Sequence, residues 1–200
     1  MRAEPDSRRV PAGEGRSEFR ERASRFLGFS FPVETEGEAR ALIARLGKEF
    51  HDATHVCYAW RIDGAPRAAD AGEPAGTAGK PILGAINAAG LDGALVAVVR
   101  YFGGTKLGTA GLVRCYRQAA REALENSGAR EIFSTDDFEI DAAFSQIAVV
   151  KRLIVPPDVH QVEESFGDRA RFRLRVRRSR ADDVARRLEG ERIAFRRFPS

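Results

Sequence analysis

Glycines and positive charges are combined in one short stretch of the chain in a way that suits the binding of an anion. Residues 94–102 are almost continuously apolar, which predicts a buried strand, and the apolar run stops abruptly at Gly103 and Gly104. Glycine tolerates positive φ and lets a ligand approach the backbone closely. A helix with Thr109 as its N-cap is predicted to run to about Asn126, and its first free N–H groups would point into the same region. Because such donors bind phosphate well, we predict a phosphate-binding loop.

Basic side chains flank this loop and continue along the predicted helix at spacings of three and four residues. The predicted anion-binding set consists of Arg100, Gly103, Gly104, Lys106, Gly108, Arg114, Arg117 and Arg121. The alternative is that the glycines only form a tight turn, while Lys106 is solvated and the helix arginines pair with Glu122 and Glu125. Neither a Walker A sequence nor a GxGxxG motif is present, so the sequence leaves both interpretations open.

Four further polar residues lie in segments that could meet a ligand: His55, Asp70, Glu73 and Thr77. His55 begins an alternating segment, residues 55–62, which predicts a strand with Val56 and Trp60 on its core face. Residues 63–80 are rich in glycine and proline and are predicted to form a long loop. Its two carboxylates could act as acid and base, or could hold Lys106 or Arg100 by ion pairing. We favour ion pairing.

The single cysteine of the strand at 55–62 invites a comparison with nucleophilic enzymes. Cys57 shares a strand face with His55, but no acid is placed to orient the imidazole, so no thiolate nucleophile is predicted. His51, His55 and Cys57 lack the fourth ligand that a structural zinc site needs. We therefore expect no metal and no cofactor, and enzymatic activity is an alternative rather than the prediction.

Five arginines alternate with apolar residues near the C-terminus. They are Arg169, Arg171, Arg173, Arg175 and Arg177. In a strand the apolar residues would face the core and the arginines would share the other face, which suits contact with RNA phosphates. That face lacks the aromatic side chains that stack on bases, and Glu139 or Asp141 on a neighbouring strand could neutralise part of the ladder. Phosphate binding and internal pairing stay equal alternatives.

Changes in composition divide the chain into three parts. Residues 1–16 carry almost no large apolar side chain and are expected to form a disordered leader. Residues 17–134 are predicted to form an N-terminal domain, including a helix over residues 36–50 with Thr35 as its N-cap. A polar break at residues 134–137 is the expected boundary. Residues 136–200 follow a βαββαβ order, which is ferredoxin-like, so the expected fold class is α+β.

The overall composition fits a soluble globular protein. The 200 residues are 43% hydrophobic, and a net charge of +4 with a pI near 9.4 permits binding to polyanions. No apolar run reaches the 18 residues of a membrane helix, and no secretory signal is present. Two cysteines in unlike settings suggest reduced thiols and a cytoplasmic location. The sequence does not indicate an oligomeric state.

Three segments resemble the signature of the YigZ/IMPACT family in their order and spacing. They are HDATHVCYAWRI (residues 51–62), DAGEPAGTAGKPIL (residues 70–83) and VVRYFGGTKLGTAGLVRCY (residues 98–116). With the SRF segment at residues 24–26 and the small C-terminal domain, the resemblance extends from about Ser17 over nearly the whole chain. Two positions depart from the family pattern: Ala71 replaces a second acid, and Ala110 replaces a glycine. The first departure weakens any role that needs paired carboxylates.

The resemblance implies both a fold and a role in translation. Its N-terminal domain would share the fold of a ribosomal small-subunit protein and of the fourth domain of elongation factor G, and its C-terminal domain would resemble that factor's fifth domain. Eukaryotic members regulate translation by binding a ribosome-associated activator of a stress kinase. We therefore hypothesise a cytoplasmic protein that associates with RNA or the ribosome and affects translation. The alternatives are an enzyme acting on a phosphorylated small molecule at the same loop, with Asp70, Glu73 or His55 transferring protons, and a module that binds a protein partner.

Overall fold

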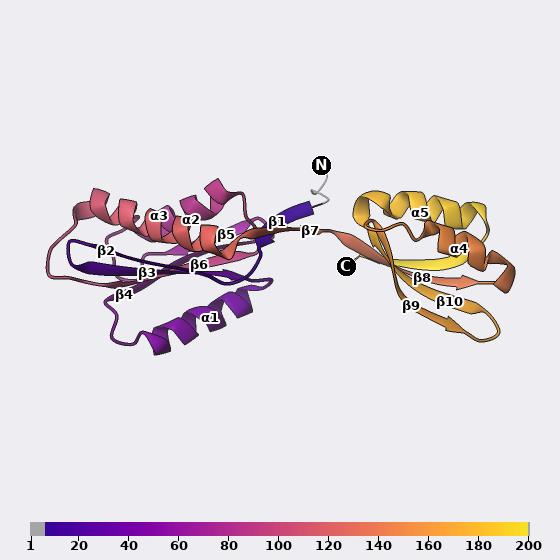
Figure 1. Cartoon of the computed structure of the whole chain (residues 1–200), viewed down its shortest axis with the longest axis horizontal. Helices are drawn as coiled ribbons and strands as arrows, with labels where there is room; N and C mark the ends of the chain where they lie inside the picture. Colours follow the sequence, from indigo (N-terminus) through magenta and orange to yellow (C-terminus); the bar gives the residue numbers. More distant parts are fainter. Residues whose placement is uncertain (1–6, 200) are drawn as a thin grey trace. The chain divides into compact units, whose positions relative to one another are not determined.

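The computed structural model describes residues 7–199 and shows two compact units that each combine helices with a sheet (Figure 1). One unit is Arg9–Glu131, and the other contains residues 132–199 together with residues 7 and 8. The predicted α+β class is confirmed. The division falls a few residues before the polar break that we expected to separate the domains.

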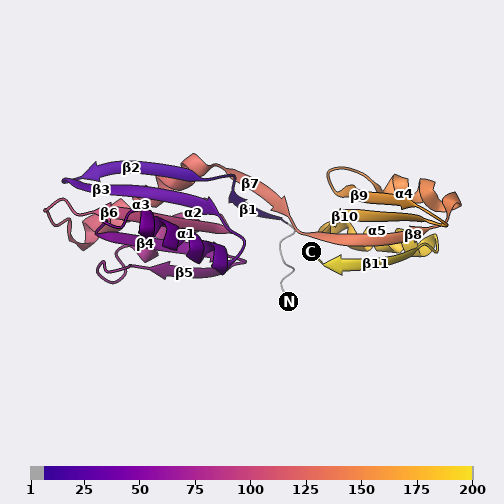
Figure 2. The same cartoon turned by 90° about the horizontal axis from the view of Figure 1, so that it is seen from below.

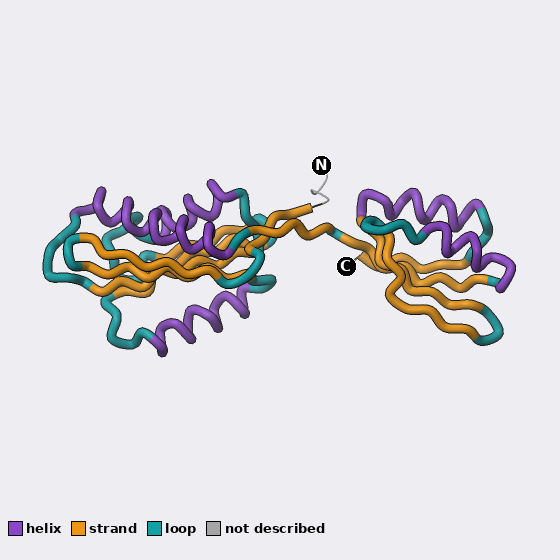
Figure 3. Tube along the Cα trace, viewed as in Figure 1, coloured by secondary structure: helices purple, strands orange, loops and turns teal. Residues whose placement is uncertain are grey.

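The N-terminal unit is built on a five-stranded antiparallel sheet in the order β2-β3-β6-β4-β5 (Figure 2). Its strands are β2 (Gly15–Glu21), β3 (Ser24–Pro32), β4 (His55–Ile62), β5 (Ala65–Ala69) and β6 (Ala94–Tyr101). Its helices are α1 (Glu36–Glu49), α2 (Gly79–Ala89) and α3 (Gly108–Ser127). Helix α1 covers one face of the sheet, and α2 and α3 cover the other (Figures 1 and 3).

Because helices cover both faces, the central strands are buried on both sides. Cys57, Ala59 and Val98 belong to the core beneath α2 and α3, whereas Trp60 and Leu95 belong to the core beneath α1. The predicted core face of the strand at 55–62 is confirmed by Trp60, but the opposite face, which was not predicted to be core, is buried as well. Alternation alone could not reveal the second covered face, since the small side chains on it have a weak apolar signature.

The helix starts show one success and one error of the sequence analysis. Thr35 caps α1 as predicted, because its side chain accepts a hydrogen bond from the Glu38 N–H at 3.2 Å. Helix α3 instead begins at Gly108, which has φ +71°, and Leu107 at its N-cap position makes no side-chain capping bond. Thr109, the predicted cap, lies inside the helix.

Two segments that we expected to be irregular form strands. Residues 7–16 of the predicted disordered leader contribute β1 (Ser7–Pro11) and the start of β2, and β1 pairs with β7 (Ala129–Phe133) in a two-stranded sheet. Residues 1–6 of that leader lie outside the described residues. The predicted long loop at 63–80 contains β5, which pairs with β4 at the sheet edge. The side chains of β5 are mostly exposed, so its sequence resembles that of a loop, whereas β1 is too short and polar to show a clear strand pattern although Val10 and Pro11 are buried.

The C-terminal unit has the expected βαββαβ element order and an antiparallel sheet in the order β11-β8-β10-β9. Its elements are β8 (Thr135–Ala142), a 3-10 turn (Phe144–Gln146) leading into α4 (Ile147–Leu153), β9 (Val159–Phe166), β10 (Ala170–Arg177), α5 (Arg178–Gly190) and β11 (Ala194–Pro199). Most of the polar break expected at residues 134–137 forms the start of β8. Asp136 and Asp137 are buried there because arginines pair with both.

Candidate functional site

A buried polar cluster lies inside the N-terminal unit, where β4, β6 and α3 meet the loop that precedes α2. The carboxylate of Glu73 accepts hydrogen bonds from Arg100 Nη1 at 2.5 Å and from the Tyr116 hydroxyl at 2.7 Å. The side chains of Glu73 and Arg100 are only 3% and 6% exposed. The predicted use of a loop carboxylate for ion pairing with Arg100 is thus confirmed for Glu73.

Asp70 holds the same loop together by binding its backbone. Its carboxylate accepts hydrogen bonds from the N–H groups of Gly76 at 2.7 Å, Ala78 at 3.0 Å and Gly79 at 2.8 Å. Burial acts to raise the pKa of Asp70, but the three backbone donors outweigh it and lower the pKa below its ordinary value. Thr77 is buried and donates to the Pro74 carbonyl at 2.7 Å. The side chains of Asp70 and Thr77 therefore make their hydrogen bonds with the backbone of this loop and of the start of α2.

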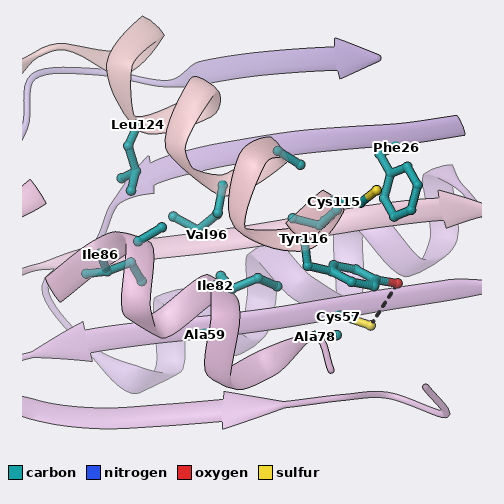
Figure 4. Packing of buried hydrophobic residues seen from close by; sticks show 14 of the residues in the cluster. Phe26, Cys57, Ala59, Ala78, Ile82, Ile86, Val96, Cys115, Tyr116 and Leu124 are labelled. Carbon is teal, nitrogen blue, oxygen red and sulfur yellow. Dashed lines mark hydrogen bonds between the residues drawn. The ribbon is translucent and has the colours of Figure 1, made fainter. Parts of the chain in front are cut away.

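Cys57 is a buried, hydrogen-bonded thiol in this setting. It donates to the Asp70 carbonyl at 2.9 Å and lies 3.4 Å from the Tyr116 hydroxyl, as the dashed line in Figure 4 shows. Burial raises the pKa of Cys57 to about 12, so the thiolate form that a nucleophile needs is scarce near neutral pH. Burial likewise raises the pKa of Tyr116.

His55 lies at the outer border of the cluster. Its Nδ1 is 3.0 Å from the Ala71 carbonyl, and because a carbonyl can only accept, this nitrogen carries the proton. Its Nε2 is 3.8 Å from the Glu73 carboxylate. The imidazole thus lies between the loop backbone at Ala71 and the Glu73 carboxylate of the cluster.

The structure removes one residue from the anion-binding set predicted around the glycine-rich connection between β6 and α3. Arg100 does not take part, because both faces of β6 are covered and its guanidinium is turned into the buried cluster. Gly103 is required by close packing, since a Cβ there would lie 2.1 Å from the Ala23 backbone. Gly104 and Gly108 have φ of +85° and +71° with open space where a Cβ would stand. Lys106 between them is exposed and has no ion pair within residues 7–199.

The outer face of α3 carries the other three predicted cations. Arg114 pairs with Glu21 at 2.8 Å, and Arg121 pairs with Glu125 at 2.7 Å, while Arg117 is exposed without an ion pair in the described part of the chain. Two hollows of about 630 and 690 Å³ lie along this helix, and Arg117 and Arg121 line both. Internal pairing therefore applies to Arg114 and Arg121, and anion binding by the stripe stays a prediction.

Comparisons with known proteins assign the chain to a family. The profile of the Impact N-terminal domain matches residues 22–124, which include the buried cluster and the glycine-rich connection. The chain belongs to the IMPACT family. An IMPACT family member encoded in the pol 5′ region of Thermus thermophilus is 40% identical over 153 residues, which are 76% of this chain and 84% of that protein. The IMPACT family member YigZ of Escherichia coli is 33% identical over 137 residues, 66% of this chain and 67% of that protein.

A solved structure supports the same assignment at the level of the fold. The crystal structure of a hypothetical protein is 25% identical, covers 98% of both chains and superimposes with a TM-score of 0.70. The resemblance of the signature segments to the YigZ/IMPACT family is thereby confirmed. Within residues 7–199 of this IMPACT family chain, no group of three His, Cys, Asp or Glu side chains is arranged to hold a metal ion, and none of the helices is long and apolar enough to cross a membrane.

An exposed aromatic residue in the IMPACT family signature was missed by the sequence analysis. Phe102 directly follows β6 and is 46% exposed, although it ends an apolar run that predicted burial. Its N–H donates to the Thr54 hydroxyl at 2.9 Å, and the guanidinium of Arg100 lies 5.6 Å from its ring centroid. The adjoining glycine pair was the available signal, since it marks the end of the covered strand.

The arginine ladder of the C-terminal unit is largely paired. Arg173 and Arg175 both contact the Asp137 carboxylate at 2.9 Å, and Arg169 pairs with Asp141. The hydrogen bond from Arg175 leads the causes that lower the pKa of Asp137. A hollow of about 640 Å³ on this open face is lined by both signs of charge, from Glu139, Asp141, Glu163, Arg171, Arg173 and Arg196. Internal pairing therefore accounts for more of the ladder than an open basic surface does.

Proposed function

We propose that this IMPACT family chain binds RNA, as a ribosome-associated regulator of translation in the cytoplasm, through the β6–α3 connection and the outer face of α3. The observation that carries the proposal is the pair of exposed cations Lys106 and Arg117, which have no ion pair in the described part of the chain. Lys106 stands between Gly104 and Gly108, where open backbone lets a phosphate approach.

The paired arginines of α3 are also available to a polyanion. Arg114 is 66% exposed and Arg121 is 57% exposed, so their ion pairs contribute little stability and can be exchanged for phosphate contacts. A guanidinium has five N–H donors, so it can bind phosphate while still contacting a carboxylate. The two hollows along α3 give a backbone room to lie between these side chains.

Family membership supports the link to translation, which the signature segments imply. In the same proposal the N-terminal unit has the fold shared with a ribosomal protein and with domain IV of elongation factor G. The C-terminal unit is ferredoxin-like, and its strand order β11-β8-β10-β9 within a βαββαβ chain supports this assignment.

Salt-dependent RNA binding tests the proposal. Fluorescence anisotropy with a structured RNA would compare the wild type with Lys106→Gln/Arg117→Gln at several salt concentrations. The double variant should bind more weakly, and its plot of log affinity against log salt should flatten by about one unit per lost phosphate contact. The control is Arg45→Gln/Lys48→Gln, which removes the same charge from exposed positions of α1 across the sheet (Figure 1).

The outcomes separate the proposal from its alternatives. An effect of equal size in the control variant would mean that net charge, rather than this surface, governs binding. A wild-type protein that binds neither RNA nor ribosomes at low salt would refute the proposal. If the protein bound a phosphorylated small molecule in a Lys106-dependent way and did not bind RNA, the alternative of an enzyme acting on such a molecule would be favoured.

A further inference from the structure

We propose that Phe102 is a stacking platform for an unpaired nucleobase, so that the ligand of the proposed surface is single-stranded rather than duplex RNA. This inference rests on the proposed RNA-binding function and specifies the class of RNA. An aromatic ring that is fixed on one face and open on the other can stack on a base, since every base has a π-face.

The inner side of Phe102 is held by the buried cluster. The Arg100 guanidinium lies 5.6 Å from the Phe102 centroid and 5.5 Å from the Phe26 centroid, within cation–π distance of both rings. Glu73 in turn fixes Arg100 through the ion pair at 2.5 Å. An aromatic ring, a buried cation and a second aromatic ring are thus fixed together at the end of β6.

The backbone beside the ring is fixed as well. Thr54 donates its N–H to the Arg100 carbonyl at 2.9 Å, and the Phe102 N–H donates to the Thr54 hydroxyl at 2.9 Å. Gly103 donates its N–H to the Ser24 hydroxyl at 3.2 Å. Because the backbone on both sides of the ring is held and a guanidinium lies over the ring, stacking on it should cost little conformational entropy.

The surroundings favour a base over an apolar protein partner. In Arg9–Glu131, all of which the structure describes, Phe102 is the one exposed large apolar side chain, so it belongs to no apolar patch of the kind that protein interfaces use. Lys106 follows four residues later and offers a cation to the adjoining phosphate, and the glycines between them leave space for the sugar-phosphate chain.

Matched single-stranded and duplex RNAs test this assignment. The probes are a fluorescein-labelled 12-nucleotide RNA of CAA repeats and the same strand in a 12-base-pair duplex, both at low salt. Phe102→Ala should weaken single-strand binding about 5- to 150-fold and leave duplex binding within about twofold. Phe102→Leu, which keeps an apolar side chain but has no π-face, should behave as Phe102→Ala, whereas Phe102→Trp should retain the affinity.

A second signal and a control make the result specific. With 2-aminopurine at the central adenine, the wild type should quench the base fluorescence, and the Phe102→Ala complex at saturation should not. Phe144→Ala, at a 55% exposed position of the C-terminal unit, should change neither affinity. Thermal unfolding should show that the Phe102 variants are folded.

Failure of this inference differs from failure of the proposed function. Wild-type protein that binds RNA with equal losses on both probes in Phe102→Ala, or with no loss, would overturn the stacking role while the RNA-binding proposal stands. Wild-type protein that binds neither probe would overturn both. A Phe102→Leu variant with wild-type single-strand affinity would show that the ring is needed only as an apolar surface and would also overturn the assignment.

Discussion

Replacing Glu73 by glutamine should destabilise the N-terminal unit far more than breaking an exposed ion pair. The substitution keeps the shape of the side chain and removes its charge, which leaves the Arg100 guanidinium buried without a counter-ion. Removing one partner of a buried pair costs about 3–5 kcal/mol of unfolding free energy. For a unit of this size, this corresponds to a fall in Tm of about 10–20 °C.

The chain contains a suitable probe for this measurement. Trp60 is the single tryptophan, lies in β4 and is 1% exposed, so its fluorescence reports unfolding of the N-terminal unit alone. Urea unfolding at neutral pH would give the free energies. The control is Glu36→Gln, which breaks an exposed i,i+4 pair with Arg40 and should cost about 0.5 kcal/mol or less.

A double variant separates the buried charge from other effects of the substitution. Glu73→Gln combined with Arg100→Met removes both charges, so it should be more stable than Glu73→Gln alone. If Glu73→Gln costs no more than Glu36→Gln, or if the two substitutions are additive, the ion pair does not carry the stability assigned to it here.

Two further predictions concern a close contact and a pH dependence. Gly103→Ala should lower the Tm of the N-terminal unit more than Gly104→Ala. A Cβ at position 103 would lie 2.1 Å from the Ala23 backbone, whereas a Cβ at position 104 has open space and costs only the φ penalty of about 1–2 kcal/mol. Equal losses of Tm in the two variants would contradict this packing. Asp137 has a lowered pKa, so its contribution to stability is complete above its ordinary value of 3.8 and is lost as the pH falls through the folded-state value. Urea unfolding of the C-terminal unit from pH 6 to 2, followed by circular dichroism, should therefore show a weaker pH dependence in Asp137→Asn, and an unchanged dependence would refute the role of this carboxylate.

Elements with strong local signals could be predicted from the sequence. Helix α1 has helical apolar spacing and an N-cap threonine, and β10 alternates apolar residues with arginines; the structure confirms the cap and the alternation. In both cases the deciding information lies within a few consecutive residues. The β1 and β2 strands lacked such a signal because few of their side chains are apolar, and pairing with β7, which is distant in sequence, and with β3 completes them.

The candidate site shows why residue type alone was insufficient. Arg100 was assigned to an anion site because it is a cation beside glycines, whereas its position in β6, covered on both faces, turns it into the core. The sequence did support pairing with Glu73 as one of two uses of that carboxylate. The sequence could not show that Tyr116, on a helix distant in the chain, donates to the same Glu73 oxygen.

The burial of the Glu73 carboxylate also bears on what the signature segments do. An acid used in proton transfer must be reachable by a substrate, yet the Glu73 side chain is 3% exposed and Oε1 is occupied by Arg100 and Tyr116. A buried ion pair is also weak support for stability as such, since an apolar pair could fill the same space. Its distinctive consequence is positional: it holds a guanidinium over the ring of Phe102, which precedes the cation Lys106 by four residues in the chain. The buried Glu73–Arg100 pair of the signature therefore helps to position the exposed ring of Phe102.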